Sequence, residues 1–332
     1  MRKLIEIIQQ RLGLPFKGVS AVVQLLENGA SIPFIARYRK EMTGSLDEVA
    51  IGQIQEAYQS LQDLIKRKNY ILSKIEEQGK LNPKLKSKVE NCWDEIELED
   101  IYLPYKKKVK TKASIAREQG LEPLAKRIFH QDHFDIYKAA KSFIQKDVKT
   151  DDDALQGARY IIAEWINEDQ RSRDTIRYLF KRKATIHAKL IKSKQDEAHK
   201  YKDYFDFSES LQRIPSHRLL AILRGENEKL LRLKIGIDQE EAAYKLEKQH
   251  IKQRTPASKQ IKLVIEDCLN RLLLPSISNE FRKTAKEKAD QDAIHVFSEN
   301  LRQLLLAAPL GEKVIIGVDP GFRTGCKVVC LG

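Results

Sequence analysis

The stretch SLDEVAIGQIQEAYQSLQDLIKRKNYILSKIEEQG (Ser45–Gly79) decides the fold class of this chain. Its apolar residues recur mostly at every third or fourth position, which gathers them on one face of an α-helix. Ser45 and Glu48 have the spacing of a capping box, in which side chains accept free backbone N–H groups at the start of a helix. Gly79 is a natural end, because glycine readily adopts the left-handed conformation of helix ends. The stretch therefore predicts a long amphipathic helix with one buried face.

The same helical spacing recurs along most of the chain. It predicts further helices at residues 83–92, 114–129, 135–146, 153–200, 215–224, 239–253, 257–272 and 278–307. Strand patterns are few: Lys229–Ile237 alternates well enough for a short strand, and Lys313–Val318 and Cys326–Leu331 are β-branched runs. The last two runs flank a connector rich in Pro and Gly, which predicts a β-hairpin. We therefore expect a mainly α fold, a multi-helical assembly with one short strand region near 229–237 and a terminal hairpin.

The composition is that of a globular protein with a real core. The chain has 332 residues, 42% of them hydrophobic, with only 15 Gly and 10 Pro, which argues against a disordered or collagen-like chain. The longest apolar stretch, Leu304–Leu310, is far shorter than the ~20 residues that cross a bilayer. The first residues contain Glu6 and no small-residue cleavage site, so we expect neither a secretory signal nor a membrane partner. Four cysteines exclude a disulfide scaffold and favour the reducing cytoplasm.

The charge balance is basic. The formal net charge is +13, with 60 Lys and Arg against 47 Asp and Glu. Arg171–Lys202 alone carries eleven basic and three acidic residues. Such an excess attracts polyanions, of which nucleic acid is the first candidate and an acidic membrane or protein partner the next. The alternative is ordinary solubility charge.

The first candidate for nucleic-acid contact is Lys17–Lys40. Two short helices around Asn28 and Gly29 have the spacing of a helix-turn-helix, whose second helix enters the major groove. The cations that this second helix offers are Arg37, Arg39 and Lys40. The alternative is a structural corner, in which Phe34, Ile35 and Tyr38 face the core. Arg37 then pairs with Glu41 one turn on.

The second candidate is a run of lysines that follows an acidic stretch at residues 94–100. Pro104 and its neighbouring tyrosines predict a fixed turn that presents the lysines to phosphates without base reading. These lysines are Lys106, Lys107, Lys108, Lys110 and Lys112. The alternatives are a solvated loop, or neutralisation of the lysines by the acidic stretch within the fold.

The third candidate lies in the basic part of the helix predicted at residues 153–200. There, Ile176, Leu179 and Phe180 begin a stripe expected to be buried, and cations surround it. The cations proposed to bind are Arg177, Lys181, Arg182, Lys183 and Lys189. A basic amphipathic helix can meet nucleic acid, a membrane surface or an acidic partner.

Signatures of catalysis are absent from the sequence. Asp319 follows a predicted strand, as the first carboxylate of some metal-dependent nucleases does, but a two-metal site needs several carboxylates. The alternative is that Asp319 only caps the turn. Cys326 and Cys330 lack the spacing of zinc ligands. We therefore expect no enzyme activity, no metal and no cofactor.

Four blocks in one order resemble a known family. They are VSAVVQLLENGASIPFIARYRKEMTGSLDE, EDIYLPYKKKVKTKASIAREQGLEPLA, SHRLLAILRGENEKLLRLKI and VIIGVDPGFRTGCK. Together they resemble the N-terminal part of the Tex family of bacterial transcription accessory proteins, from about Gly18 to Gly332.

The resemblance implies a domain plan. It implies an N-terminal helical region at 1–205 with a helix-turn-helix-like element near 17–40, and a second helical region at 206–312. It further implies that residues 313–332 are the truncated start of a YqgF domain with an RNase H-like fold. Tex proteins continue into helix-hairpin-helix modules and an RNA-binding domain. The YqgF domain of Tex is regarded as catalytically incomplete, so the resemblance does not imply nuclease activity for this chain.

The leading hypothesis is therefore an N-terminal portion of a transcription accessory protein that contacts RNA or DNA without sequence specificity. A second hypothesis is a scaffold that docks onto RNA polymerase or onto the missing C-terminal half. A third is a part of a metal-dependent RNase H-like nuclease, for which Asp319 is the only support.

Overall fold

The computed structural model describes residues 1–332 apart from 108–109, 146, 254, 309–310 and 322–324. The chain divides into two compact units. The first comprises Met1–Arg127 and Tyr137–Gln170, and the second comprises Ile128–Ile136 and Arg171–Gly332. The boundary expected between residues 205 and 206 falls inside the second unit.

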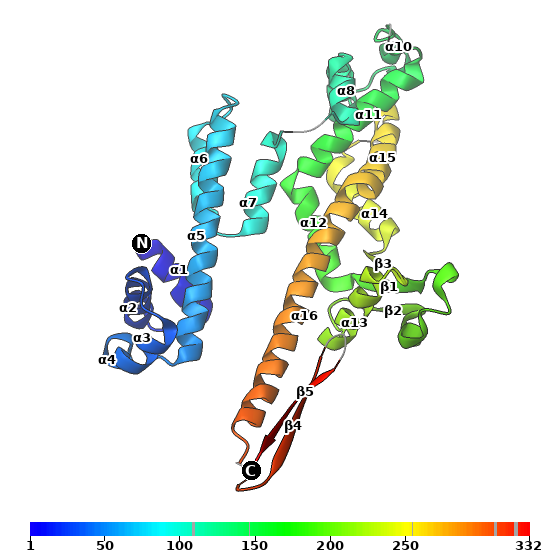
Figure 1. The fold of residues 1–332 in the computed structure, drawn as a ribbon. Coiled ribbons are helices and arrows are strands. Elements are labelled where there is room, and N and C mark those ends of the chain that lie inside the picture. The colour runs from blue at the N-terminus through cyan, green and yellow to red at the C-terminus, as the bar shows by residue number, and fades with distance from the viewer. Residues whose placement is uncertain (108–109, 146, 254, 309–310, 322–324) are drawn as a thin grey trace. The chain divides into compact units, whose positions relative to one another are not determined.

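Helices build the first unit (Figure 1). They are α1 (Arg2–Leu12), α2 (Phe16–Glu27), α3 (Ile32–Tyr38), α4 (Lys40–Thr43), α5 (Glu48–Glu76), α6 (Pro83–Asn91), α7 (Glu95–Tyr102), the short 3-10 helix η1 (Leu103–Tyr105), α8 (Lys112–Glu118), α9 (Glu122–His130), α10 (Ile136–Lys141) and α11 (Asp151–Glu168). The last turn of α9 belongs to the second unit.

The long helix α5 confirms the prediction made from its apolar spacing. One face of it is buried, and the core there includes Ile51, Ile54 and Leu61. The predicted capping box is wrong. Ser45 lies before the helix with a φ of 64°, and the carboxylate of Asp47 accepts the N–H of Ala50 at 2.8 Å. The Asp47 side chain replaces Ser45 because it occupies the position directly before the first helical residue, where an acceptor reaches that N–H.

The corner between α2 and α3 has the expected connection. Gly29 lies in the turn with a φ of 80°, a conformation that glycine adopts without strain. Ile35 of α3 is buried, as predicted, whereas Phe34 and Tyr38 are 39% and 65% exposed. The expectation that the aromatic residues of this helix face the core is therefore wrong. Helix α3 has only two turns, so it has one narrow buried stripe, and Ile35 and Ala36 fill it.

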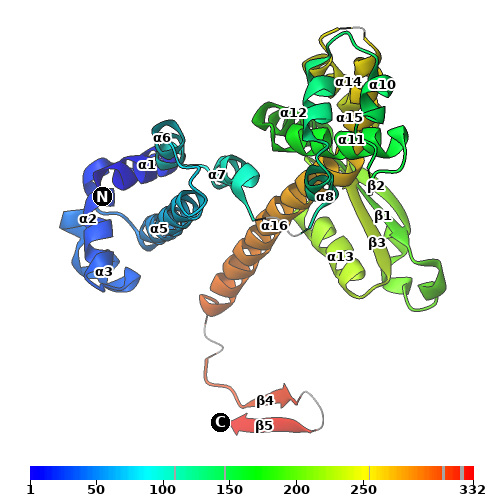
Figure 2. The same ribbon diagram turned by 90° about the horizontal axis from the view of Figure 1, so that it is seen from above.

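The second unit combines helices with a small sheet (Figure 2). Its elements are α12 (Gln170–Lys183), β1 (Thr185–Leu190), the 3-10 helices η2 (Lys192–Lys194) and η3 (His199–Tyr204), β2 (Asp206–Ser210), α13 (Ser216–Asn227), β3 (Leu231–Gly236), α14 (Gln239–His250), α15 (Pro256–Cys268), the π-helical segment η4 (Leu269–Leu273), α16 (Leu274–Leu305), β4 (Ile315–Pro320) and β5 (Cys326–Leu331).

The sheet contains the strand predicted at residues 229–237 and two that were not predicted. Its order is β2-β1-β3, and both pairings are antiparallel, with Thr185 opposite Ser210 on one side and Gly236 on the other. The single helix predicted over 153–200 is wrong. The chain forms α11 and α12 there and then turns into β1, whose buried residues Ile186 and Ala188 alternate with less buried ones. Strand β1 is stabilised by partner strands distant in sequence, which local spacing does not reveal.

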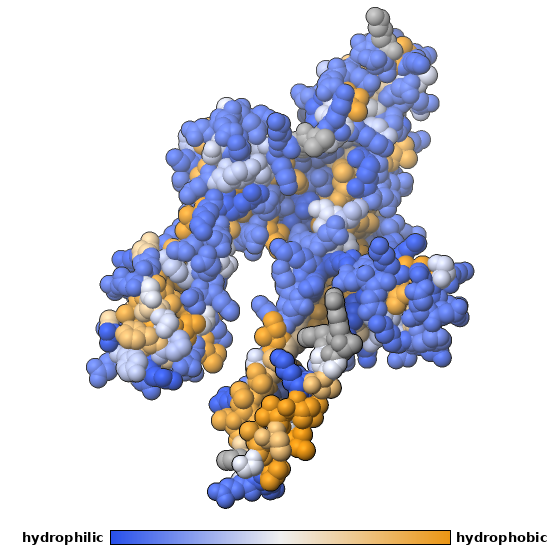
Figure 3. Space-filling view, viewed as in Figure 1, coloured by the Kyte–Doolittle hydropathy of each residue, from blue (hydrophilic) through white to orange (hydrophobic). Residues whose placement is uncertain are grey.

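The terminal hairpin forms as predicted. Strands β4 and β5 pair antiparallel, with Ile315 opposite Leu331. Apolar side chains gather at the surface of this hairpin and of the last turns of α16 (Figure 3). The most exposed of them, at more than 70%, are Leu304, Leu305, Leu306 and Val314. Among the described residues, no helix has the length and apolar character needed to cross a bilayer.

Two glycines give a direct test of the packing around α2. A Cβ added at Gly18 would lie 2.6 Å from the backbone oxygen of Thr43, whereas one added at Gly52 in α5 would have Ile32 Cδ1 as its nearest neighbour at 3.9 Å. We expect Gly18→Ala to lower the free energy of unfolding by about 1–2 kcal/mol, because overpacking outweighs the gain in helix propensity. Gly52→Ala, the matched control, should raise it by up to about 1 kcal/mol.

The measurement is urea unfolding followed by tryptophan fluorescence. All proteins carry Trp165→Phe, so that Trp93, which packs against the core of α5, is the sole reporter. Equal stability of the two glycine variants would show that α2 and Thr43 do not pack as described.

Candidate nucleic-acid interface

The three cations predicted at the helix-turn-helix-like element lie together on the surface. Arg37 and Lys40 are exposed, and among the described residues neither forms an ion pair, so the pairing of Arg37 with Glu41 is not present. Arg39 lies between α3 and α4, with its guanidinium 5.1 Å from the centroid of the Phe34 ring. The ring of Tyr38 is 5.5 Å from that of Phe34. Cations and exposed aromatic rings therefore share one small surface.

The lysine run lies on the connection between α7 and α8. Lys106, Lys107 and Lys110 are exposed, and Lys112 starts α8 with its ammonium 4.8 Å from the Tyr160 ring. The predicted Lys108 lies outside the described residues. The carbonyl of Tyr105 accepts a hydrogen bond from the Gln78 side chain at 2.7 Å, which fixes the start of the run.

Two residues of the acidic stretch before these lysines, Asp94 and Glu99, have partners elsewhere. Glu99 accepts two hydrogen bonds from Arg67, at 2.6 and 3.1 Å, and this contact raises the pKa of Arg67. Asp94 caps the start of α7 through the N–H of Glu97. Within the described part of the chain, no ion pair joins residues 94–100 to Lys106, Lys107, Lys110 or Lys112. These lysines are therefore available to an external anion.

The cations of α12 divide into two groups. The side chain of Arg177, only 15% exposed, donates to Glu280 at 2.8 Å and also lies near Asp174. Lys183 pairs with Glu241 at 2.7 Å. Two of the predicted binding residues are thus already neutralised by carboxylates of the same unit. The stripe of Ile176, Leu179 and Phe180 is buried, as predicted.

The other cations that the sequence predicted to bind here are exposed. Lys181 is exposed, and Arg182 lies 5.3 Å from the ring of Tyr178. Lys189 is separated from them because it lies on β1, opposite Asp206 of β2 and Arg232 of β3. The predicted stretch is therefore not one continuous basic helix.

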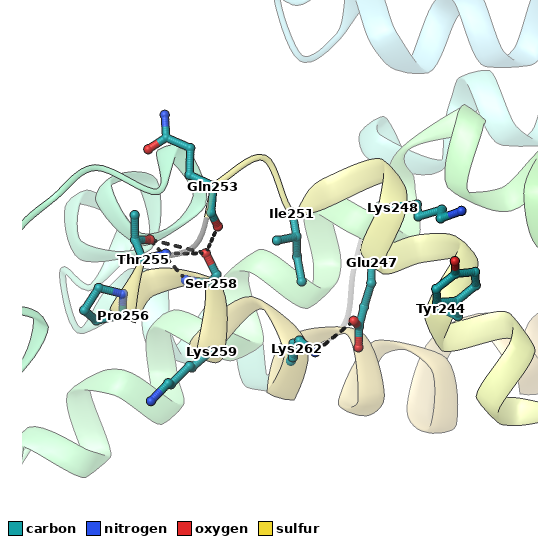
Figure 4. Close-up of a pocket in the computed structure, with 10 residues that line it drawn as sticks. All are labelled: Tyr244, Glu247, Lys248, Ile251, Gln253, Thr255, Pro256, Ser258, Lys259 and Lys262. Atoms are coloured by element: carbon teal, nitrogen blue, oxygen red, sulfur yellow. Dashed lines mark hydrogen bonds and ion pairs between the residues drawn. The ribbon is translucent and has the colours of Figure 1, made fainter.

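A basic hollow that sequence reasoning missed lies between α14 and α15 (Figure 4). Its volume is about 770 Å³. Tyr244 and Lys248 line it from α14, and Lys259 and Lys262 line it from α15. A signal was available, because Tyr244–Lys262 contains six Lys and Arg residues and one acidic residue, a density that matches the Arg171–Lys202 stretch.

Two protein-family models match the helical part of the chain. Residues 131–297 match the family model described as Tex central region-like, and residues 2–76 match the Tex-like protein N-terminal domain. The chain belongs to the Tex family.

Several relatives carry the resemblance along nearly the whole chain. The uncharacterized protein YdcI of Bacillus subtilis is 44% identical over 97% of this chain. The transcriptional accessory protein Tex of Neisseria gonorrhoeae is 38% identical over 97%, and the S1 RNA-binding domain-containing protein 1 of Homo sapiens is 31% identical over 99%. The chain spans 45%, 43% and 34% of these three Tex-family relatives.

The cysteines and acidic residues of this Tex-family chain are dispersed. Cys92 and Cys268 are buried, and burial raises the pKa of both thiols. Cys326 and Cys330 are exposed on β5. In the described part of the chain, no group of three His, Cys, Asp or Glu residues is placed to hold a metal ion.

Proposed function

We propose that this chain is the N-terminal portion of a transcription accessory protein and holds nucleic acid by its phosphates, without sequence specificity and without catalysis. The observation that carries the proposal is a set of exposed cations that no carboxylate among the described residues neutralises. They include Arg37, Lys40, Lys106, Lys107, Lys110, Lys181 and Lys189. One relative is named a transcriptional accessory protein and another an S1 RNA-binding domain-containing protein. These names support nucleic acid as the partner.

The helix-turn-helix-like element is proposed to grip the phosphate backbone rather than read bases. In a reading helix, residues near the N-terminus contact base edges. The first turn of α3 instead carries Ile32, Pro33 and Phe34, and the cations lie at its far end. Guanidinium groups so placed suit phosphate oxygens, which position a protein without specifying sequence.

The hairpin is proposed to be the start of an RNase H-like domain. Its six-residue strands expose apolar side chains, and a lone two-stranded hairpin is marginally stable in water. Asp319 is the only carboxylate on these two strands, so the proposal includes no cleavage step.

A second candidate function, protein scaffolding, is favoured by the exposed apolar surface at the end of α16 and on the hairpin. Contiguous exposed apolar surface of this kind marks a docking site. We propose that the segment following this chain in a longer protein docks there, with RNA polymerase as the alternative partner.

Salt dependence tests the nucleic-acid function. Labelled single- and double-stranded oligonucleotides are titrated with the chain at rising salt, and affinity is read by fluorescence anisotropy. Contacts to about 4–6 phosphates give a log–log slope of roughly −3 to −4 for single strands. Binding that is absent at low salt, or that does not change with salt, contradicts the proposed function.

A matched pair of variants tests the lysine run in the same assay. Lys106→Gln with Lys107→Gln should reduce the slope by about 1.4 for single strands, because two phosphate contacts are lost. Lys84→Gln with Lys86→Gln removes the same charge from α6, where both side chains are exposed, and should leave the slope unchanged. Equal slopes for the two variants would remove the lysine run from the interface.

Thiol reactivity tests whether a following segment covers the hairpin. In the 332-residue chain, Cys326 and Cys330 should react quickly with an aromatic disulfide reagent, and buried Cys92 and Cys268 slowly. In a chain extended to the length of the relatives, Cys326 and Cys330 should react slowly with the reagent, and Cys268 should still react slowly. Unchanged fast labelling in the extended chain would rule out docking on the hairpin and shift the scaffold hypothesis to an external partner.

A further inference from the structure

Two hollows are lined by residues of α14 and share one lysine. The hollow between α14 and α15 is lined by Tyr244 and Lys248, as Figure 4 shows. A second hollow of about 450 Å³ is lined by Tyr178 of α12 together with Lys245 and Lys248 of α14. Because Lys248 lines both, the two hollows form one surface. We call the set Tyr178, Lys245, Lys248, Tyr244 and Lys259 the α14 track.

The two aromatic rings of the α14 track are available for stacking. Tyr178 and Tyr244 are each 55% exposed. A cation lies over one face of each ring: Arg182 is 5.3 Å from the Tyr178 centroid, and the Lys248 ammonium is 4.6 Å from the Tyr244 centroid. An exposed ring beside a cation offers a π-face to a nucleobase and a positive charge to its phosphate.

The lysines of the α14 track form no ion pair in the described part of the chain, although two carboxylates also line the hollows: Asp174, which lies near Arg177, and Glu247, which pairs with Lys262. Lys245, Lys248 and Lys259 are exposed, and none has a carboxylate partner in the described part of the chain. Two other lysines of these helices do have such partners: Lys262 pairs with Glu247 at 3.1 Å, and Lys183 pairs with Glu241. The three unpaired lysines therefore line the same two hollows as the two rings.

A buried glutamine holds the connection between α14 and α15 in place. Gln131 is 1% exposed, and its side chain donates to the carbonyl of His250 at 2.6 Å. Its side-chain oxygen accepts the N–H of Lys252 at 2.9 Å. The Ser172 hydroxyl contacts the His250 ring at 2.7 Å, which ties the end of α14 to α12. The walls of both hollows are therefore fixed before any ligand arrives, which lowers the entropic cost of binding.

We propose that the α14 track is a binding site for single-stranded nucleic acid, with bases stacked on Tyr178 and Tyr244 and the backbone phosphates held by the three lysines. Stacking on an exposed ring requires an unpaired base, because the faces of duplex bases are covered by their neighbours. An acidic protein segment would use the lysines but would gain little from the rings. This proposal rests on the proposed function and adds to it the strand form of the ligand.

The rings are tested by anisotropy with a labelled 15-nucleotide oligouridylate and a labelled 15-base-pair duplex. Tyr244→Ala and Tyr178→Ala should each weaken single-strand binding by about fivefold or more, the lower end of what one stacked base contributes. Tyr244→Phe should stay within about twofold of the parent, because the ring remains. Tyr137→Ala is the control, since Tyr137 is 56% exposed on α10 and lines neither hollow. Duplex binding should not change in any of the four.

The lysines are tested by the salt slope for the same oligouridylate. Lys248→Gln with Lys259→Gln should lower the slope by about 1.4, whereas Lys84→Gln with Lys86→Gln should leave it unchanged. Circular dichroism checks that the variants fold. A polyglutamate peptide with as many residues as the oligouridylate has nucleotides serves as the competing acidic ligand.

The outcomes separate this proposal from the proposed function. If the parent binds both oligonucleotides with a steep salt slope but the tyrosine variants bind the single strand normally, the α14 track is overturned and the proposed function remains. If the parent binds neither oligonucleotide at low salt, both are overturned. If the variants lose polyglutamate binding and keep oligouridylate binding, the track serves an acidic protein and the proposal is wrong.

Discussion

A cation attracts a phosphate only when no carboxylate of the same chain already neutralises it, and this constraint decides which surfaces of the protein are electropositive. The chain has an excess of basic residues, but the excess is not spread evenly once the ion pairs are known. Arg177 and Lys183 are used to join α12 to α16 and α14, and Arg67 is used to hold α7. The cations that remain for an external polyanion include Lys181, Lys189 and those of the lysine run before α8, the end of α3 and the surface of α14.

Much of the helical architecture was predictable, because apolar spacing is a local property of the sequence. Helix α5, strand β3 and the terminal hairpin were found in this way. Strand β1 was not predicted, because its short alternating pattern begins directly after the end of helix α12. Its stability also depends on β2 and β3, which come later in the chain. The start of α5 was misplaced by the choice of Ser45 rather than Asp47 as the capping residue.

The sequence predicted where basic residues gather in the candidate site, but not which of them form ion pairs. A count of basic residues located the region around Arg177, yet its partner Glu280 is 103 positions away, and no spacing rule connects them. The hollow beside α14 was missed for a different reason. Its charge density equals that of the stretch that was chosen, but the exposure of Tyr178 and Tyr244 depends on the packing of three helices and is not visible in the sequence.

Photocrosslinking with mass spectrometry tests the central claim most directly. A single-stranded RNA containing 4-thiouridine is bound to the chain at low salt, irradiated and digested, and the modified peptides are identified. Contact through unpaired cations and exposed rings predicts adducts on peptides that contain Tyr178 or Tyr244, lost when salt is raised. Adducts confined to peptides outside α3, the lysine run before α8, α12, α14 and α15, or adducts that persist at high salt, would contradict this account.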